Sequence, residues 1–112
     1  ARLLGDVAVF EAEIRNGMGL TPLGAYPATG LSEGEKALLL VRPEGVILGR
    51  SDAEGALANI SERRVSSGYA RLTCRLETGH VLEARASLKE NHRVGDAVRL
   101  RVEPAFAHFV TA

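Results

Sequence analysis

The sequence YARLTCRLETGHVLEARASL, residues 69–88, alternates apolar and polar side chains on both sides of a turn signal. Every second residue from Ala70 to Leu76 is apolar, and the same period returns from Leu82 to Leu88. A period of two is the spacing of a β-strand with one buried face, whereas a helix repeats every 3.6 residues. These residues therefore predict a β-hairpin whose apolar face packs on a core.

The length of the turn decides which residues of this hairpin face each other. A two-residue turn would place polar residues of one strand against apolar residues of the other, which contradicts the pattern. A three-residue loop over 78–80, with its glycine in the left-handed conformation, keeps both faces consistent. This loop predicts that Leu76 pairs with Leu82 and that Arg75 pairs with Glu83.

The period of two extends over most of the chain. Residues 8–14 alternate and end at an Asn-Gly turn, and residues 56–65 and 97–103 predict two further strands. The run 37–41 (Ala-Leu-Leu-Leu-Val) is apolar throughout, so it predicts a strand buried on both faces. Shorter strands are expected at 18–26, 46–48 and 106–110. The prediction is an all-β fold, a small barrel or sandwich of about eight or nine short strands forming one domain over 1–112.

The composition supports one folded domain and argues against several classes of function. The chain has 112 residues, 46% of them hydrophobic and 25% charged, and no apolar run is long enough to span a membrane. Fourteen basic residues balance fourteen acidic ones, and only 4% of residues are aromatic, which disfavours nucleic-acid binding. The first residue is not Met, so we expect a fragment of a longer chain.

The strongest charge pattern is an outward-facing set of arginines on the predicted strands. Twelve of the fourteen basic residues are Arg, which favours planar, paired contacts. Two interpretations remain open, a docking surface or anion site and a solvated ladder of cross-strand ion pairs. The alternation alone does not separate them, and we favour the ladder because it is the more common arrangement. The possible interaction face consists of Arg71, Arg75, Arg85, Arg99 and Arg101.

No combination of residues indicates catalysis, a metal or a cofactor. The sequence lacks a nucleophile elbow, a phosphate-binding glycine loop and paired histidines at helical spacing. His80 and His92 fall in predicted turns and are expected to be solvated, while His108 is expected to pack in the last strand. Cys74 lies on the inward face and is expected to be a core residue with an unreactive thiol.

Four segments resemble one known family. The stretch LLLVRPEGVIL (38–48) resembles the strand-Arg-Pro-Glu-turn of transport-associated OB domains, known as TOBE domains. The segments LLGDVAVFEAEI (3–14), TPLGAYPA (21–28) and VGDAVRLRVEPAFAHFV (94–110) resemble other landmarks of the family in the same order. The segment TPLGAYPA (21–28) is similar to the hairpin of the ferric-iron-type branch of the family.

The resemblance implies a function as well as an OB-like barrel. It implies the C-terminal regulatory domain of an ATP-binding-cassette importer ATPase, without cofactor or catalysis of its own, for a solute such as ferric iron or a polyamine. The Walker motifs would lie upstream, and the partners would be a second copy, the ATPase domain and, indirectly, the membrane permease. The location would be cytoplasmic, at the inner face of the membrane. Arg42, Pro43 and Glu44 are expected to have an architectural role.

Two alternatives belong to other classes of binding domain. One is a single-stranded nucleic-acid-binding OB domain, which the zero net charge and scarce aromatics disfavour. The other is a small-oxyanion binder, like molybdate-binding relatives of the fold. Its ligand would be held by backbone amides and by side chains such as Ser66, Ser67 and Lys89.

Overall fold

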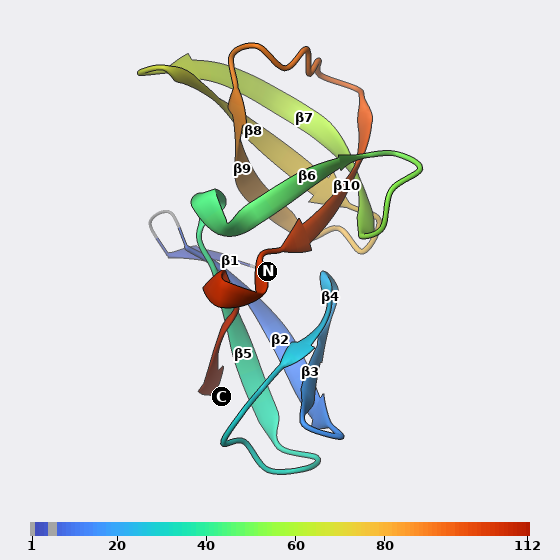
Figure 1. Cartoon of the computed structure of the whole chain (residues 1–112), viewed down its shortest axis with the longest axis vertical. Coiled ribbons are helices and arrows are strands. Elements are labelled where there is room, and N and C mark those ends of the chain that lie inside the picture. The colour runs from blue at the N-terminus through green and yellow to red at the C-terminus, as the bar shows by residue number, and fades with distance from the viewer. Residues whose placement is uncertain (1, 5–6) are drawn as a thin grey trace.

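The computed structural model describes residues 2–4 and 7–112, which form two antiparallel sheets (Figure 1). Sheet A contains β1 (Arg2–Leu4), β2 (Val7–Arg15), β3 (Met18–Thr21), β4 (Gly24–Pro27), β5 (Lys36–Val41) and β11 (His108–Thr111). Sheet B contains β6 (Val46–Arg50), β7 (Ala56–Ser66), β8 (Tyr69–Leu76), β9 (Val81–Ser87) and β10 (Ala97–Val102). Two 3₁₀ helices, η1 (Pro43–Gly45) and η2 (Pro104–Phe106), connect the sheets. The all-β prediction is confirmed, with eleven strands among these residues rather than eight or nine.

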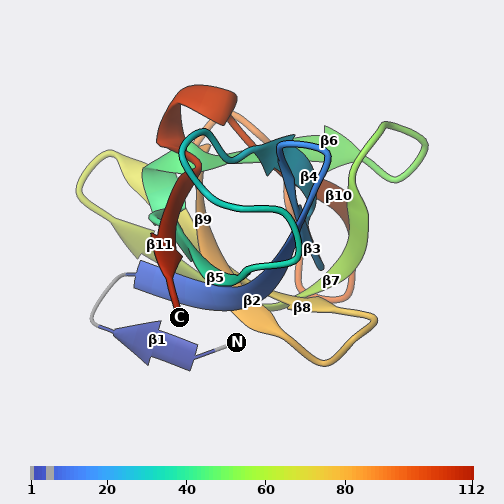
Figure 2. The same cartoon turned by 90° about the horizontal axis from the view of Figure 1, so that it is seen from below.

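Sheet A has the strand order β11-β5-β2-β3-β4, and β1 pairs with β2 (Figure 2). The turn between β2 and β3 is the predicted Asn-Gly pair, and both of its residues have positive φ, 52° at Asn16 and 75° at Gly17. This is the geometry in which a two-residue hairpin turn matches the twist of its strands. None of the described residues forms a helix that is long and apolar enough to cross a membrane.

Sheet B has the order β6-β10-β7-β8-β9, and its β8–β9 hairpin contains a three-residue loop, as predicted. The loop is Glu77–Gly79, however, one residue earlier than expected. The Leu76 N–H donates to the His80 carbonyl at 2.8 Å, which closes the hairpin, and Gly79 has a φ of 90°.

The predicted register of this hairpin is therefore wrong by two residues. Arg75 pairs with Val81 instead of Glu83, and Glu83 lies opposite Thr73. A shift of two residues leaves each side chain on the same face, so the apolar pattern cannot detect it. Only the choice of loop residues separates the two registers.

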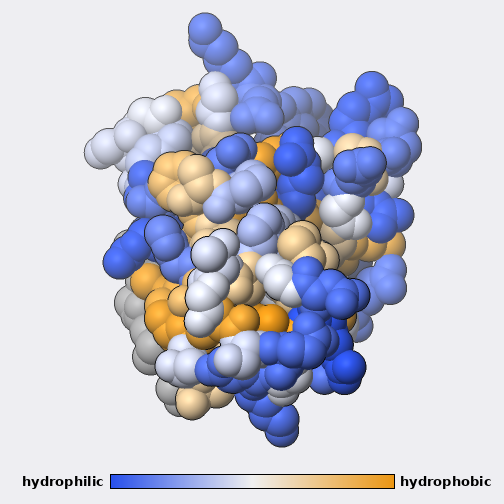
Figure 3. Space-filling model, turned by 60° about the horizontal axis from the view of Figure 1, so that its bottom comes forward, coloured by the Kyte–Doolittle hydropathy of each residue, from blue (hydrophilic) through white to orange (hydrophobic). Residues whose placement is uncertain are grey.

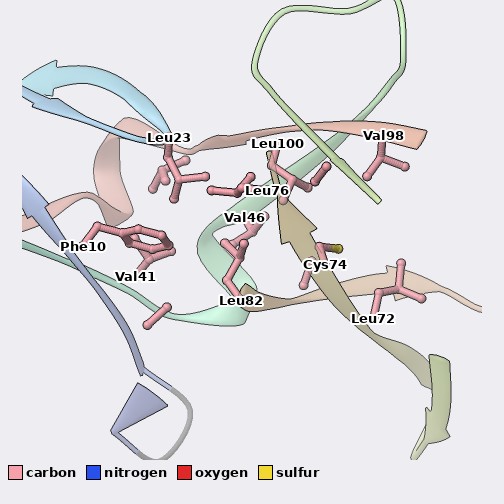
Figure 4. Close-up of a cluster of buried hydrophobic side chains, with 14 of the residues drawn as sticks. Phe10, Leu23, Val41, Val46, Leu72, Cys74, Leu76, Leu82, Val98 and Leu100 are labelled. Carbon is pink, nitrogen blue, oxygen red and sulfur yellow. The ribbon is translucent and has the colours of Figure 1, made fainter. Parts of the chain in front are cut away.

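One hydrophobic core lies between the sheets (Figure 4). Phe10 and Leu39 from sheet A and Leu72, Leu82 and Leu100 from sheet B are fully buried. The alternation had assigned the three leucines of sheet B to inward positions, whereas Leu39 lies in the run that was predicted to be buried on both faces. Among residues 7–112 no polar or charged residue is buried. The two sheets therefore depend on the same apolar contacts.

The strand β5 is not buried on both faces, contrary to the prediction. Leu39 points into the core, whereas Leu38 and Leu40 on the opposite face are only half-buried. On the same face Val110, the register partner of Leu38, is 42% exposed. Sheet B covers only one side of sheet A, and apolar atoms gather on the lower side of the molecule (Figure 3). A continuous apolar run does not show whether a strand is covered by other elements on both faces or on only one.

Candidate functional site

The Arg42-Pro43-Glu44 motif forms the passage from sheet A to sheet B. Pro43 is the first residue of η1, where its fixed φ suits a helical turn, and it is buried. The Gly45 N–H donates to the Arg42 carbonyl at 2.9 Å, which closes the turn. Arg42 and Glu44 are exposed, and within residues 7–112 the side-chain hydrogen bonds and ion pairs include neither of them. The motif thus supplies a backbone bend with two charged side chains facing solvent.

The return passage, η2, lies directly against the first one. A Cβ on Gly45 would come within 2.6 Å of the Phe106 Cβ, so only glycine fits there without a shift. In addition, the Glu103 N–H donates to the Gly45 carbonyl at 2.9 Å. Both passages between the sheets therefore meet at Gly45. Gly45 is not among the predicted site residues, because a glycine in a turn carries no sign of a close neighbour in its local sequence.

A second connection between the sheets is the buried hydroxyl of Tyr26. This hydroxyl, on β4, donates to the Leu23 carbonyl at 2.7 Å and accepts from the Val102 N–H of β10 at 2.8 Å. Burial raises the pKa of Tyr26, although the hydrogen bond from Val102 and the charge of Arg101 act in the opposite direction. The phenol therefore stays protonated as a donor. Its role was missed because a tyrosine in a short edge hairpin gives no sequence signal for a long-range partner.

The five arginines of the predicted interaction face lie in two groups. Arg71 and Arg85 are directly opposite each other on β8 and β9, and Arg75 follows farther along β8. Arg99 and Arg101 lie on β10, on the other side of β7. The Arg99 side chain donates to the carbonyls of two residues in the β6–β7 loop, Ser51 and Gly55, at 3.0 and 3.2 Å. The structure thus brings together the first three and gives Arg99 a contact with a loop.

Arg64 extends the first group, although the sequence analysis did not include it. It lies on β7 opposite Arg71, because a bulge between Ile60 and Glu62 shifts the register of β7. The Glu83 carboxylate contacts both arginines, with one oxygen 3.5 Å from Arg64 and the other 2.5 Å from Arg71. We call Arg64, Arg71 and Arg85 the arginine row. An unrecognised bulge explains why the alternation of β7 did not reveal its third member.

The histidines differ from their predicted surroundings. His80 is half-buried, with its ring centre 5.4 Å from that of Phe10, and burial lowers its pKa while Glu11 opposes the shift. His92 is also half-buried, its side chain 20% exposed and 3.4 Å from Glu90. The expectation that both are solvated is therefore wrong. His108 is exposed rather than packed, because its side chain points to the open face of the edge strand β11.

The structure describes little that resembles a metal or anion cage. Within the described residues, no three His, Cys, Asp or Glu side chains come together as a metal site. Cys74 is fully buried, as predicted, and burial raises its pKa to about 12. Ser66, Ser67 and Lys89 lie at one end of sheet B, where β7 turns into β8 and β9 ends. All three lie at least partly in solvent.

A groove of about 390 Å³ runs over the outer face of sheet A. The residues that line it include the apolar Leu20 and Leu38 and the charged Glu11, Glu13 and Lys36. The groove mixes both signs of charge and is widely open to solvent. It does not have the enclosed shape that small-molecule sites usually have.

Comparisons with known proteins agree on a fold and a family. A family model described as the TOBE domain matches residues 39–110. No curated protein matches the chain. Among solved structures, the chain is similar to the cytoplasmic molybdate-binding protein ModG in a form with molybdate bound. The TM-score is 0.76 at 12% sequence identity, over 94% of this chain and 96% of that one, which indicates a shared fold.

Proposed function

Because this chain belongs to the TOBE domain family, we propose that it is the regulatory domain of the ATP-binding subunit of a solute importer. In this function the domain carries no catalysis and no cofactor, and it acts through contact with other protein surfaces. Its partners are a second copy of the same subunit, the ATPase domain of its own chain and, indirectly, the permease in the membrane. It works at the cytoplasmic face of the membrane, and the solute is ferric iron or a polyamine.

The observation that carries this proposal is the family match over residues 39–110, which includes half of β5, both sheet-connecting passages and all of sheet B. Two further features are compatible with a contact domain. The described residues offer no enclosed pocket with convergent catalytic groups, and charged side chains cover the outer face of sheet B. Surfaces of this kind bind other macromolecules more readily than they enclose a substrate.

The decisive test is to sequence the gene upstream of the codon for Ala1. The proposal expects a nucleotide-binding P-loop and an importer signature motif in the same reading frame. The full-length subunit should then hydrolyse ATP, and deletion of residues 39–110 should change the coupling of hydrolysis to transport while hydrolysis itself persists. A reading frame without ATPase motifs would exclude the proposal.

A second candidate function is the binding of a small oxyanion. It is favoured by the similarity in fold to a protein whose crystals contain molybdate. In this chain Ser66, Ser67 and Lys89, together with nearby backbone amides, would hold the anion. Calorimetric titration with molybdate, tungstate and sulfate tests it directly. Heats no larger than those of dilution for all three anions would rule this candidate out, and Lys89→Ala should weaken any binding that is found.

A further inference from the structure

We propose that the arginine row on the outer face of sheet B is a docking site for a carboxylate-rich segment of a partner protein. The row runs across three neighbouring strands. Arg64 lies opposite Arg71, and Arg71 lies opposite Arg85, so the three side chains point from the same face of the sheet. Like charges in directly opposite positions destabilise a sheet, and the carboxylates of Glu62 and Glu83 offset part of this repulsion. The inference does not depend on the importer function.

The contacts within the row show how it holds a carboxylate. Glu83 lies on β9 opposite Thr73, beside the row, and its carboxylate places one oxygen near Arg64 and the other near Arg71. Its side chain is only 14% exposed, so this bound carboxylate lies within the surface of the sheet. Each oxygen meets a different guanidinium, so two arginines on neighbouring strands share one carboxylate. A carboxylate supplied by a partner can approach the exposed guanidinium groups of Arg64 and Arg85 in the same way.

The outer two arginines are exposed to solvent, although the Arg64 Nε also lies 3.6 Å from the Glu62 carboxylate. The Arg64 side chain is 60% exposed, and Arg85 is also exposed. The guanidinium carbon of Arg85 lies 4.8 Å from the centre of the Tyr69 ring, which supports the side chain from below. An arginine held by a ring loses less conformational freedom when it binds an anion.

The charge of this surface differs from that of the whole chain. The outward positions of β7, β8 and β9 carry Arg64, Arg71, Arg75 and Arg85 against Glu62 and Glu83. Four positive and two negative charges give a formal net charge of +2, whereas the whole chain has a net charge of zero. A positive surface on a neutral protein attracts acidic partners locally without making the protein a general polyanion binder.

The neighbouring residues favour an acidic protein segment over nucleic acid or a membrane. Nucleic acid needs exposed aromatic faces for stacking, and the Tyr69 ring is already in contact with Arg85. A membrane surface favours apolar side chains beside the basic ones, whereas Thr73 and Ser87 flank the row. Carboxylates therefore suit this surface best.

The test measures the binding of fluorescein-labelled hexaglutamate to the whole chain by fluorescence anisotropy. We expect saturable binding that weakens as salt is added. The double variant Arg64→Gln/Arg85→Gln should bind about five- to tenfold more weakly. Arg50→Gln is the matched control, because the Arg50 side chain is 90% exposed and lies on β6, away from the row. This variant should bind like the original chain.

A second variant separates docking from a purely structural role. Glu83→Gln removes the internal carboxylate that occupies the row, so it should strengthen hexaglutamate binding even if it lowers the melting temperature. Circular dichroism checks that each variant is folded. Equal binding by the double variant and by Arg50→Gln would overturn the proposal. So would the absence of hexaglutamate binding, or binding found only with oligothymidylate or with phosphatidylglycerol vesicles.

Discussion

The hydroxyl of Tyr26 provides a sharp test of how the two sheets are held together. Tyr26→Phe keeps the ring in the core and removes only the oxygen. The Val102 N–H then loses its acceptor and the Leu23 carbonyl loses a donor, both in a buried region where water cannot easily replace them. A buried polar group without a partner costs about 1–3 kcal/mol. With two groups affected, we expect a loss of about 2–3 kcal/mol in the free energy of unfolding.

Urea denaturation followed by circular dichroism at neutral pH measures this loss. For a chain of this size the expected decrease in melting temperature is about 8–12 °C. The control is Tyr69→Phe, since Tyr69 is the only other tyrosine and its ring contacts Arg85 at the surface. A surface substitution of this kind should change stability by less than about 0.5 kcal/mol. Equal losses in both variants would refute the assignment of the Tyr26 hydroxyl as a connection between the sheets.

The same residue predicts a dependence on alkaline pH. The pKa of Tyr26 in the folded chain is raised above its ordinary value of 10.0, mainly by burial. The unfolded chain therefore releases this proton first, so stability falls as pH rises from about 10 towards the folded-state pKa. Tyr26→Phe should lack this part of the decline. Parallel stability curves for the two proteins above this pH would contradict the reasoning.

Two further predictions concern the core and the β6–β7 loop. The Cys74 thiol is buried and its pKa is about 12. At mildly alkaline pH it should react with a disulfide reagent at least about a hundredfold faster in denaturant than in the folded chain. Similar rates in the two conditions would mean that the thiol is not buried. Gly55→Ala should destabilise the chain by about 3 kcal/mol or more, because φ is 129° and a Cβ would lie 2.7 Å from the Leu100 carbonyl oxygen. Gly30→Ala, where φ is also positive but no atom lies nearby, should lose only about 1 kcal/mol in the same thermal melts.

The alternation of side chains predicted the strands and their inward faces well, because burial imposes that period directly. It placed Leu72, Cys74 and Leu100 in the core, where the structure has them. The Asn-Gly turn was also predictable, since few other residue pairs accept two positive φ values. In both cases the physical constraint, burial of one face or a positive φ, acts on the same residues that form the pattern.

The errors concern features that the apolar pattern leaves undecided. The register of β8 and β9 depended on which three residues form the loop, and both choices satisfied the apolar pattern. Arg64 joined the arginine row only because of a bulge in β7, which leaves no mark in the sequence. The exposure of Leu40 depended on whether a second layer covers β5, and the close approach at Gly45 depended on a phenylalanine 61 positions away in the chain. The alternation of apolar and polar residues decides none of these features.

The two passages between the sheets also determine how the chain can be divided. Sheet B is built from the uninterrupted stretch 46–102, whereas sheet A combines the residues on both sides of it. The strands that flank this stretch pair with each other, with Leu40 opposite His108. The matched segment 39–110 thus begins and ends on paired strands, so its two ends lie next to each other. Such a unit can be transplanted or circularly permuted with a short linker, because its ends already meet.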